Sequence, residues 1–243
     1  SFSVAGQETA PWGLFFKPDG TKMYVNGYNQ KAVNEYSLST AWDLSTASYV
    51  QNFSLAAQDQ YPLSMFFSPS GTDMYFVGYS GVDINQHSLS TAWDVSTASY
   101  VQAFSVSAQA TGPCGVFFKP DGTKMYVIDY LQKAVNEYSL STAWDISTAS
   151  FLQSFSVHPQ ENWPNALFFS PNGDSLFIIG SGGYDVNEYT LSTAWDISTA
   201  SYVRASTADS QETYPTGLFF KSDGSKMYIL GLNTDRIYQY STA

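Results

Sequence analysis

An all-β fold made of five repeated units is the fold class that this 243-residue sequence predicts. Pairs of phenylalanines begin at positions 15, 66, 117, 168 and 219, so the repeat is 51 residues long. A fixed period of this size is typical of repeat architectures. Each unit contains short apolar or β-branched runs, and none has helical periodicity of useful length. Together these observations predict a five-bladed β-propeller that forms a single domain over residues 1–243, with four antiparallel strands in each blade.

The first repeat contains the four strands that such a blade requires. Residues 13–16 are almost wholly apolar, as expected for a strand buried on both faces, and residues 17–20 have the Pro-Asp-Gly chemistry of a tight turn. Residues 22–25, rich in aromatic and β-branched side chains, predict the second strand. A Gly/Asn-rich loop separates it from a third strand over residues 32–37, and a longer connection precedes a fourth over residues 48–54.

The two ends of the chain predict how the ring closes. Residues 1–4 align with residues 52–55, the end of a fourth strand, and the chain finishes in the third strand of its last repeat at residues 238–241. We therefore expect the N-terminal segment to supply the fourth strand of the last blade. This closure removes two exposed sheet edges that would otherwise invite aggregation, and we expect a monomeric ring.

The composition excludes several kinds of partner. The net charge is −11 and only 13% of the residues are charged, so nucleic acid and anionic lipid surfaces are unfavourable partners. The sequence has no run of 18 apolar residues, and membrane insertion is not expected. A single cysteine, Cys114, excludes an internal disulfide and a cysteine-built zinc site. This fits a cytosolic protein, but extracellular proteins without disulfides are common, and we favour an extracellular or surface-associated location.

Two features recur almost unchanged in the connection before the fourth strand. A tryptophan stands in the same Ser-Thr-Ala-Trp-Asp segment of four repeats, and we expect these rings to pack between blades, because aromatic side chains dominate burial energetics. The aspartate after each tryptophan is expected to cap the local loop rather than to bind a metal. The tryptophans are Trp42, Trp93, Trp144 and Trp195, and the aspartates are Asp43, Asp94, Asp145 and Asp196.

The segment Lys-Pro-Asp-Gly-Thr-Lys-Met-Tyr-Val at residues 17–25, followed by Val-Asn-Glu-Tyr-Ser at residues 33–37, resembles the YVTN-type propeller repeats, which are related to lactonase-like propellers. The resemblance covers every repeat and implies a turn followed by two strands. It carries no reaction, since the lactonase-like enzymes have seven blades and no motif here transfers their catalytic residues. Five nearly identical blades are also similar in architecture to the tachylectin-like propellers, and that likeness implies sugar binding.

One face of the predicted ring combines amides, carboxylates and aromatic side chains. It is formed by the loop that leads into the first strand of each blade, here called the leading loop, and by the loop between the second and third strands. Aromatic rings can pack on the C–H face of a sugar while amides and carboxylates bind its hydroxyls, so the pattern favours a glycan ligand, with a protein ligand as the alternative. The same residues could instead satisfy loop backbone groups and form a half-buried rim. The candidate ligand-binding residues are Gln7, Glu8, Trp12, Tyr28, Gln58, Asp59, Tyr61, Tyr79, Gln109, Tyr130, Gln160, Glu161, Trp163, Gln211, Glu212 and Tyr214.

The sequence offers few candidates for a catalytic centre. His87 takes the place of a strand tyrosine and His158 stands in a leading loop, and neither belongs to a known catalytic motif. Cys114 is expected to be a small buried hydrophobic residue. The acids of the leading loops stand in nearly equivalent settings, which would not separate their pKa values into the acid and base roles of a glycosidase. A shared Ca²⁺ or other hard cation would use such a ring of acids more naturally than a glycosidase mechanism, and it is kept as an alternative to our expectation that the protein has no cofactor.

These observations lead to one main hypothesis and two alternatives. The main hypothesis is a non-enzymatic binding propeller that recognises glycans or a protein surface multivalently, because repeated sites on one rigid scaffold amplify weak affinity. One alternative is a structural or assembly module of a larger surface or virion protein. The other is a hydrolase of the lactonase or glycosidase type with a single site at the mouth of the channel. Nearly identical blades favour the first two, since one catalytic centre would require a few blades to diverge.

Overall fold

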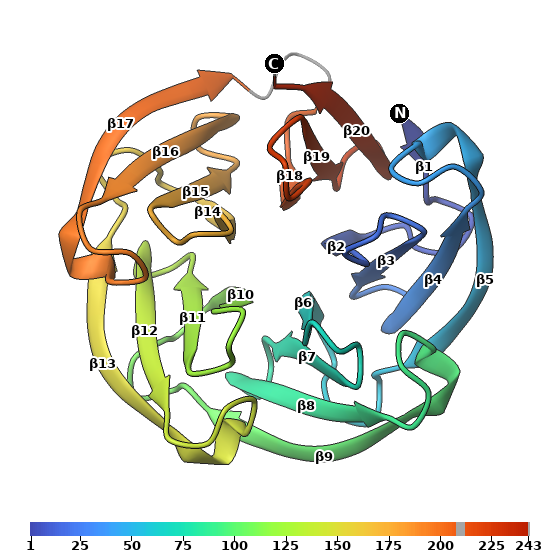
Figure 1. Ribbon diagram of the computed structural model, residues 1–243, viewed down its shortest axis with the longest axis horizontal. Coiled ribbons are helices and arrows are strands. Elements are labelled where there is room, and N and C mark those ends of the chain that lie inside the picture. Colours follow the sequence, from blue (N-terminus) through green and yellow to red (C-terminus); the bar gives the residue numbers. More distant parts are fainter. Residues whose placement is uncertain (208–211, 243) are drawn as a thin grey trace.

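The chain forms a closed ring of five blades in the computed structural model, which describes residues 1–207 and 212–242 (Figure 1). Each blade is a four-stranded antiparallel sheet, so the predicted five-bladed, all-β propeller is confirmed. Within the described ranges, no helix has the length and apolar character needed to span a membrane.

The first blade shows how the sequence fixes the depth of each strand. The innermost strand, β2 (Pro11–Phe16), is almost entirely buried, which explains its continuous apolar run. β3 (Lys22–Gly27) and β4 (Ala32–Leu38) follow outward, and β5 (Ala47–Ser54) is the outermost strand, with mostly exposed residues. From the axis outward, the second blade consists of β6 (Pro62–Phe67), β7 (Asp73–Gly78), β8 (Asp83–Leu89) and β9 (Ala98–Ser105). The third consists of β10 (Pro113–Phe118), β11 (Lys124–Asp129), β12 (Ala134–Leu140) and β13 (Ala149–Ser156). The fourth consists of β14 (Pro164–Phe169), β15 (Ser175–Gly180), β16 (Asp185–Leu191) and β17 (Ala200–Thr207).

The last blade is completed by the N-terminus of the chain. Its strands are β18 (Pro215–Phe220), β19 (Lys226–Gly231), β20 (Arg236–Ser241) and β1 (Phe2–Ser3). β1 pairs with β20 in antiparallel register, with Phe2 opposite Ile237, and the amide of Val4 donates to the carbonyl of Asp235 at 2.8 Å. The predicted ring closure is therefore confirmed, and β1 lies beside β20 in Figure 1.

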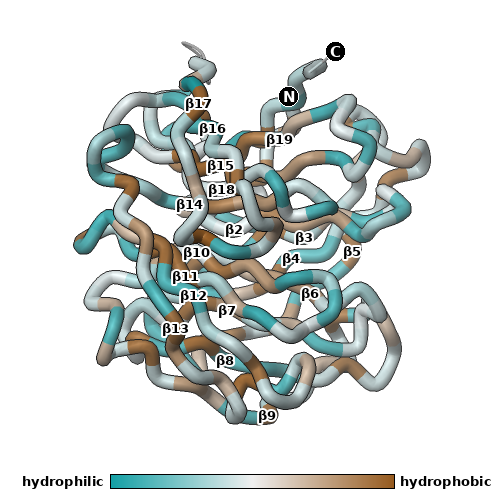
Figure 2. The backbone as a smooth tube through the Cα atoms, turned by 60° about the vertical axis from the view of Figure 1, so that its left-hand side comes forward, coloured by the Kyte–Doolittle hydropathy of each residue, from teal (hydrophilic) through white to brown (hydrophobic). Residues whose placement is uncertain are grey.

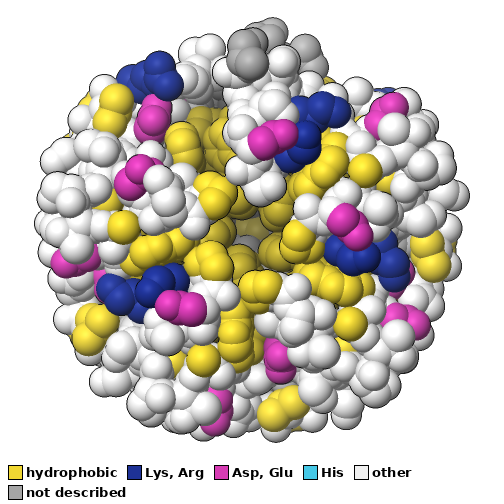
Figure 3. Space-filling model, viewed as in Figure 1, with side chains coloured by type: hydrophobic (Ala, Val, Ile, Leu, Met, Phe, Trp, Pro, Cys, Tyr) yellow, Lys and Arg dark blue, Asp and Glu magenta, His cyan; other side chains and the backbone are white. Residues whose placement is uncertain are grey.

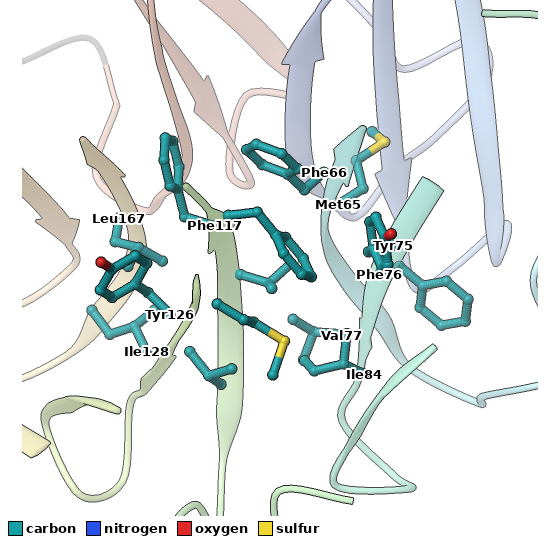
Figure 4. Packing of buried hydrophobic residues seen from close by; sticks show 14 of the residues in the cluster. Met65, Phe66, Tyr75, Phe76, Val77, Ile84, Phe117, Tyr126, Ile128 and Leu167 are labelled. Carbon is teal, nitrogen blue, oxygen red and sulfur yellow. The ribbon is translucent and has the colours of Figure 1, made fainter. Parts of the chain in front are cut away.

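The core lies between the blades, because each sheet has two apolar faces that only its neighbours can cover. Phe66, Phe117 and Leu167 come from three successive inner strands and point into the same packed region in Figure 4. In Figure 2 hydrophobic stretches run along the strands, whereas many of the hydrophilic stretches lie in the loops. The ring therefore depends on contacts between blades as much as on hydrogen bonds within them.

Each tryptophan of the Trp-Asp connection joins two blades, as predicted. In the second blade the ring of Trp93 packs on Phe67 at 5.7 Å between centroids and on Phe15 of the first blade at 6.3 Å. The carbonyl of Trp93 accepts hydrogen bonds from the hydroxyl of Tyr24 at 2.7 Å and from the ammonium of Lys22 at 2.8 Å. One residue thus supplies both apolar contact and a hydrogen-bond acceptor across the junction.

The aspartate after each tryptophan caps a single turn of 3-10 helix. Asp94 Oδ1 accepts hydrogen bonds from the amide of Ser96 at 3.0 Å and from its hydroxyl at 2.6 Å. The capping role is confirmed, whereas the helical turn itself was not predicted, because three residues are too few for a periodic signal. The four turns are η1 (Leu44–Thr46), η2 (Val95–Thr97), η3 (Ile146–Thr148) and η4 (Ile197–Thr199).

The junction between the fourth and fifth blades differs from the other four. In the last repeat the position equivalent to Trp42 falls after residue 243, so none of the described residues places a tryptophan carbonyl opposite the fourth blade. At the position of the donating tyrosine the fourth blade has Phe177, which carries no hydroxyl. This junction therefore lacks both the tyrosine hydroxyl that would donate and the described tryptophan carbonyl that would accept. The tyrosines that donate at the other four junctions are Tyr24, Tyr75, Tyr126 and Tyr228.

Candidate functional site

Two cavities lie end to end along the axis of the ring. They meet within the inner strands, where Leu63 lines one cavity and the next residue, Ser64, lines the other. The cavity on the side of the Pro-Asp-Gly turns, here called the funnel, has a volume of about 210 Å³. The cavity on the side of the leading loops, here called the bowl, has a volume of about 330 Å³.

The funnel is the hydrophobic hollow at the centre of Figure 3, and it offers no acid or base. Five phenylalanines in its wall form a closed ring, with neighbouring centroids 5.0–5.4 Å apart and planes 64–73° from one another. Surface ion pairs such as Lys17 with Asp19, at 2.7 Å, lie on the turns around the funnel. Each contributes about 1 kcal/mol at most to the stability of the fold. The phenylalanines are Phe15, Phe66, Phe117, Phe168 and Phe219.

The bowl is walled by seven aromatic side chains, all of which belong to the predicted site. Neighbouring ring centroids are 5.9–6.5 Å apart along the arc. The order of the arc is Tyr214, Trp12, Tyr28, Tyr61, Tyr79, Tyr130 and Trp163. The fourth blade has Ser181 at the position of Tyr28, so the arc is interrupted between Trp163 and Tyr214.

The acids of the leading loops hold these aromatic residues in place and do not line the bowl. Glu161 is fully buried, and its Oε1 accepts hydrogen bonds from the amides of Trp163 at 2.7 Å and Gly182 at 2.9 Å. The carboxylate thereby joins the leading loop to the loop between the second and third strands. Glycine is required opposite it, because a Cβ at Gly180 would collide with the Glu161 side chain. Glu8 and Asp59 are buried and accept from amides of the same two loops, and Glu212 is buried and accepts from the amide of Tyr214 and the hydroxyl of Thr234.

In the third blade the buried carboxylate comes from the end of a strand instead of from the leading loop. Its leading loop has Ala110 at the acid position, and β11 ends with Asp129 where the other blades have glycine. Asp129 Oδ2 accepts from the amides of Thr111 at 2.5 Å and Gly112 at 2.8 Å, and Oδ1 accepts from Leu131 at 2.7 Å. Five buried carboxylates, one in each blade, therefore surround the bowl.

The four glutamines of the leading loops that the structure describes are half-buried and lie outside the bowl. Gln7 Oε1 accepts from the hydroxyl of Tyr36 at 3.4 Å, and Gln160 Oε1 accepts from the hydroxyl of Tyr189 at 3.3 Å. Gln58 and Gln109 occupy the equivalent half-buried positions, whereas Gln211 lies outside the described residues.

Two tyrosine hydroxyls meet within the bowl. Tyr79 and Tyr130 are 3.2 Å apart between their hydroxyl oxygens, so one donates and the other keeps a proton that it can offer to a ligand. This hydrogen bond, followed by burial, raises the pKa of Tyr130 to about 12. The hydroxyl of Tyr130 therefore stays protonated at neutral pH.

Histidine, cysteine and clustered acids do not contribute to the bowl. Cys114 is fully buried, as predicted, and burial raises its pKa well above the ordinary value for a thiol. His87 lies in β8 among Phe53, Phe76 and Tyr100, and His158 is exposed. Residues 1–207 and 212–242 contain no group of three His, Cys, Asp or Glu side chains placed to hold a metal ion.

Two lining residues were missed by the sequence analysis. Leu63 and Asn165 follow the proline of the leading loop, at a position that differs in every repeat. That variability was the available signal, but only Trp12 was selected from this position. Asn165 also joins the fourth and fifth blades, since its Nδ2 donates to the carbonyl of Pro215 at 2.7 Å.

Solved structures with this fold include proteins named for lactonases. No protein-family model and no curated protein matches the sequence. A putative 6-phosphogluconolactonase from Bacteroides uniformis is similar with a TM-score of 0.57 and 16% identity, over 95% of this chain and 67% of that one. The periplasmic gluconolactonase of Pseudomonas aeruginosa gives 0.55 and 16%, over 96% and 66%. A putative 6-phosphogluconolactonase from Bacteroides fragilis gives 0.60 and 13%, over 96% and 80%.

These structures confirm the resemblance to lactonase-like propellers at the level of the fold. They also correct the main functional hypothesis. The prediction of a non-enzymatic, lectin-like propeller for glycans or a protein surface, and with it the prediction that the protein is not an enzyme, is contradicted, because the three structural neighbours are named for lactonases. The chain spans about two thirds of the length of the Bacteroides uniformis and Pseudomonas aeruginosa proteins, 67% and 66% respectively.

Proposed function

We propose that this protein is a hydrolase of the lactonase type and that the bowl is its active site. The observation that carries the proposal is the hydroxyl pair of Tyr79 and Tyr130, 3.2 Å apart, inside a cavity with aromatic walls. A volume of about 330 Å³ suits one small ring, at the lower end of the ~300–1,000 Å³ found for ligand pockets. The names of the structural neighbours support the same reaction class.

The proposed reaction opens a cyclic ester with water. The water oxygen adds to the carbonyl carbon, the carbonyl oxygen becomes negatively charged, and the free hydroxyl proton of the tyrosine pair stabilises that charge. When the ring C–O bond breaks, the carbonyl re-forms and the leaving alkoxide takes up a proton released from the attacking water. The product is an open-chain hydroxy acid, so atoms and charge balance without a further reactant.

A lactonase is favoured over a glycosidase by the side chains of the bowl. A glycosidase uses two carboxyl groups that flank the scissile bond, about 5–9.5 Å apart. No carboxylate is among the described residues that line the bowl, and the nearby acids are engaged by loop amides. Hydrogen-bond donors are what the bowl provides, and these act on a carbonyl oxygen.

Hydrolysis of gluconolactone, followed as acid release in a pH-stat, tests the proposal. We expect a rate above the uncatalysed one, and Tyr130→Phe should lower kcat by about 10²–10³-fold if its hydroxyl stabilises the oxyanion. Tyr202→Phe, on the outer strand β17 and 45% exposed, is the matched control and should leave the rate unchanged. A folded protein that accelerates neither gluconolactone nor other five- and six-membered lactones would overturn the proposal.

A further inference from the structure

The bowl combines many aromatic rings with an excess of negative charge around it. Its described lining contains no lysine, arginine or histidine. Behind the lining stand five buried carboxylates, one per blade, and three further aspartates lie on the loops and strand ends of the same face. The buried acids are Glu8, Asp59, Asp129, Glu161 and Glu212, and the further aspartates are Asp83, Asp185 and Asp235.

The few basic side chains on this face lie away from the bowl. The carbonyl of Lys31 accepts from the amide of Leu55, just beyond the outermost strand β5, and its ammonium bonds the Gln60 side chain at 2.9 Å. Lys133 has the same backbone position in the third blade, where its carbonyl accepts from Val157. Arg236 lies opposite Ser3 in the pairing of β20 with β1. Basic groups are therefore found toward the periphery, whereas buried acids such as Glu161 and Asp59 bond the amides of Trp163 and Tyr61, which line the bowl.

One tyrosine of the bowl, Tyr28, already responds to this charge. Burial is the main cause that raises the pKa of Tyr28, and the neighbouring Tyr214 and the carboxylate of Glu8 add to it. A negative potential that opposes ionisation of a hydroxyl also attracts a cation. The faces of tyrosine and tryptophan rings attract cations as well, and most strongly where water is excluded.

We infer that the bowl selects its ligand by charge and accepts a small molecule that carries an alkylated ammonium group. An alkylated ammonium presents its charge through C–H groups, so it can contact aromatic rings without losing strong hydrogen bonds to water. A phosphorylated ligand is excluded, because the bowl has no basic group to pair with a phosphate. As a statement about the substrate this inference rests on the proposed function, and it specifies a cyclic ester that bears such a group.

Calorimetric titration with choline and with 3,3-dimethylbutan-1-ol separates charge from shape. The two molecules have nearly the same size, and only choline is charged. We expect choline to bind at least roughly tenfold more tightly than the neutral alcohol, and phosphocholine to lose most of that affinity. Equal affinity for choline and the alcohol, or no binding of choline at all, would overturn the inference.

Substitutions at Trp163 locate the effect within the bowl. Its side chain is 52% exposed, so replacement is not expected to unfold the protein. Trp163→Phe keeps an aromatic face and should retain most of the preference for choline, whereas Trp163→Leu keeps an apolar side chain and should reduce it several-fold. Tyr100→Leu, 47% exposed on the outer strand β9, is the control and should change nothing. A preference for choline that survives Trp163→Leu and Tyr61→Leu would place the cation elsewhere and overturn the assignment.

Binding and turnover can fail separately. Choline binding without hydrolysis of any lactone would leave this charge selection intact and contradict the proposed reaction. Hydrolysis of neutral lactones without a preference for choline would support the reaction and contradict the charge selection.

Discussion

The hydroxyl of Tyr228 donates a hydrogen bond to the carbonyl of Trp42 at 2.8 Å, across the junction where the last blade meets the first. The same pair joins the first and second blades, where Tyr24 donates to Trp93 at 2.7 Å. The junction that closes the ring is therefore built like one within the repeat. The N-terminal strand β1 contributes only two paired residues to the last blade. The hydrogen bond from Tyr228 to Trp42 therefore adds to the contacts that close the ring.

Removal of the closing hydroxyl should weaken the ring by a modest amount. Tyr228→Phe is expected to lower the free energy of unfolding by about 1 kcal/mol, since the Trp42 carbonyl keeps its hydrogen bond from Lys226 at 2.9 Å. Phe177→Tyr adds a hydroxyl at the junction without a tryptophan carbonyl and should change stability by less than ~0.5 kcal/mol. Urea denaturation measures both. Stabilisation of Phe177→Tyr by a full hydrogen bond would contradict the explanation given for Phe177.

The glycine of the Pro-Asp-Gly turn is required for two separable reasons. Gly20 has a φ of +74°, and a Cβ there would also collide with the ring of Trp42. Gly224 has a φ of +73° but no neighbour within 4 Å of its Cβ position, because no described tryptophan lies beside it. We expect Gly224→Ala to cost about 1 kcal/mol from backbone strain, and Gly20→Ala about 1–3 kcal/mol more from overpacking. Equal losses in thermal unfolding would show that the tryptophan contact is unimportant.

The displaced acid of the third blade can be tested by exchange. Asp129→Gly alone leaves several loop amides without an acceptor and should cost about 2–4 kcal/mol. Ala110→Glu with Asp129→Gly recreates the arrangement of the other four blades and should recover most of the loss. A double-mutant cycle by chemical denaturation gives the coupling between the two positions. If the stability changes of the two single substitutions simply add in the double variant, a glutamate at position 110 does not replace Asp129.

Acid should destabilise the protein through His87. Burial lowers its pKa from 6.5 to about 4, and neither ring nitrogen has a hydrogen-bond partner among the described residues. The unfolded chain takes up a proton below pH 6.5 while the folded one does not, so stability falls between about pH 6.5 and 4, by up to about 3 kcal/mol.

The variant His87→Tyr isolates this effect. It installs the residue found at the same position in the other four blades, so it should fold normally and lose the histidine contribution to the pH profile. Acids with raised pKa values, such as Asp83 at about 6, act in the opposite direction in the same range, but they contribute equally to both proteins. Parallel pH profiles for the two proteins would contradict the assignment.

The fold could be predicted because each blade is encoded locally. The Pro-Asp-Gly turns, the apolar inner strands and the 51-residue repeat are all visible along the chain, and closure follows from comparing its two ends. The aromatic members of the site could also be found, because Tyr28 and its equivalents recur at fixed places in loops of one face.

The chemistry of the site could not be predicted in the same way. The sequence analysis placed Glu161 and its equivalents among the ligand-binding acids. In the structure they are buried and bonded to a second loop about 20 residues further along the chain, as in the hydrogen bond from the amide of Gly182 to Glu161. Only the folded blade brings those amides together. The role of Asp129 was hidden for the same reason, since its exchange with Ala110 is visible only once both loops are seen to share one carboxylate.

The missing tryptophan link between the fourth and fifth blades gives a nearly uniform ring one distinct seam. Among the described residues, four junctions carry the tyrosine–tryptophan bond, and the fifth is joined by packing and by the hydrogen bond from Asn165 to Pro215. A circle of otherwise equal units opens first at its weakest contact, so thermal fluctuations should separate these two blades before any others. The asymmetry would give the molecule a preferred hinge, although its five repeats are almost the same.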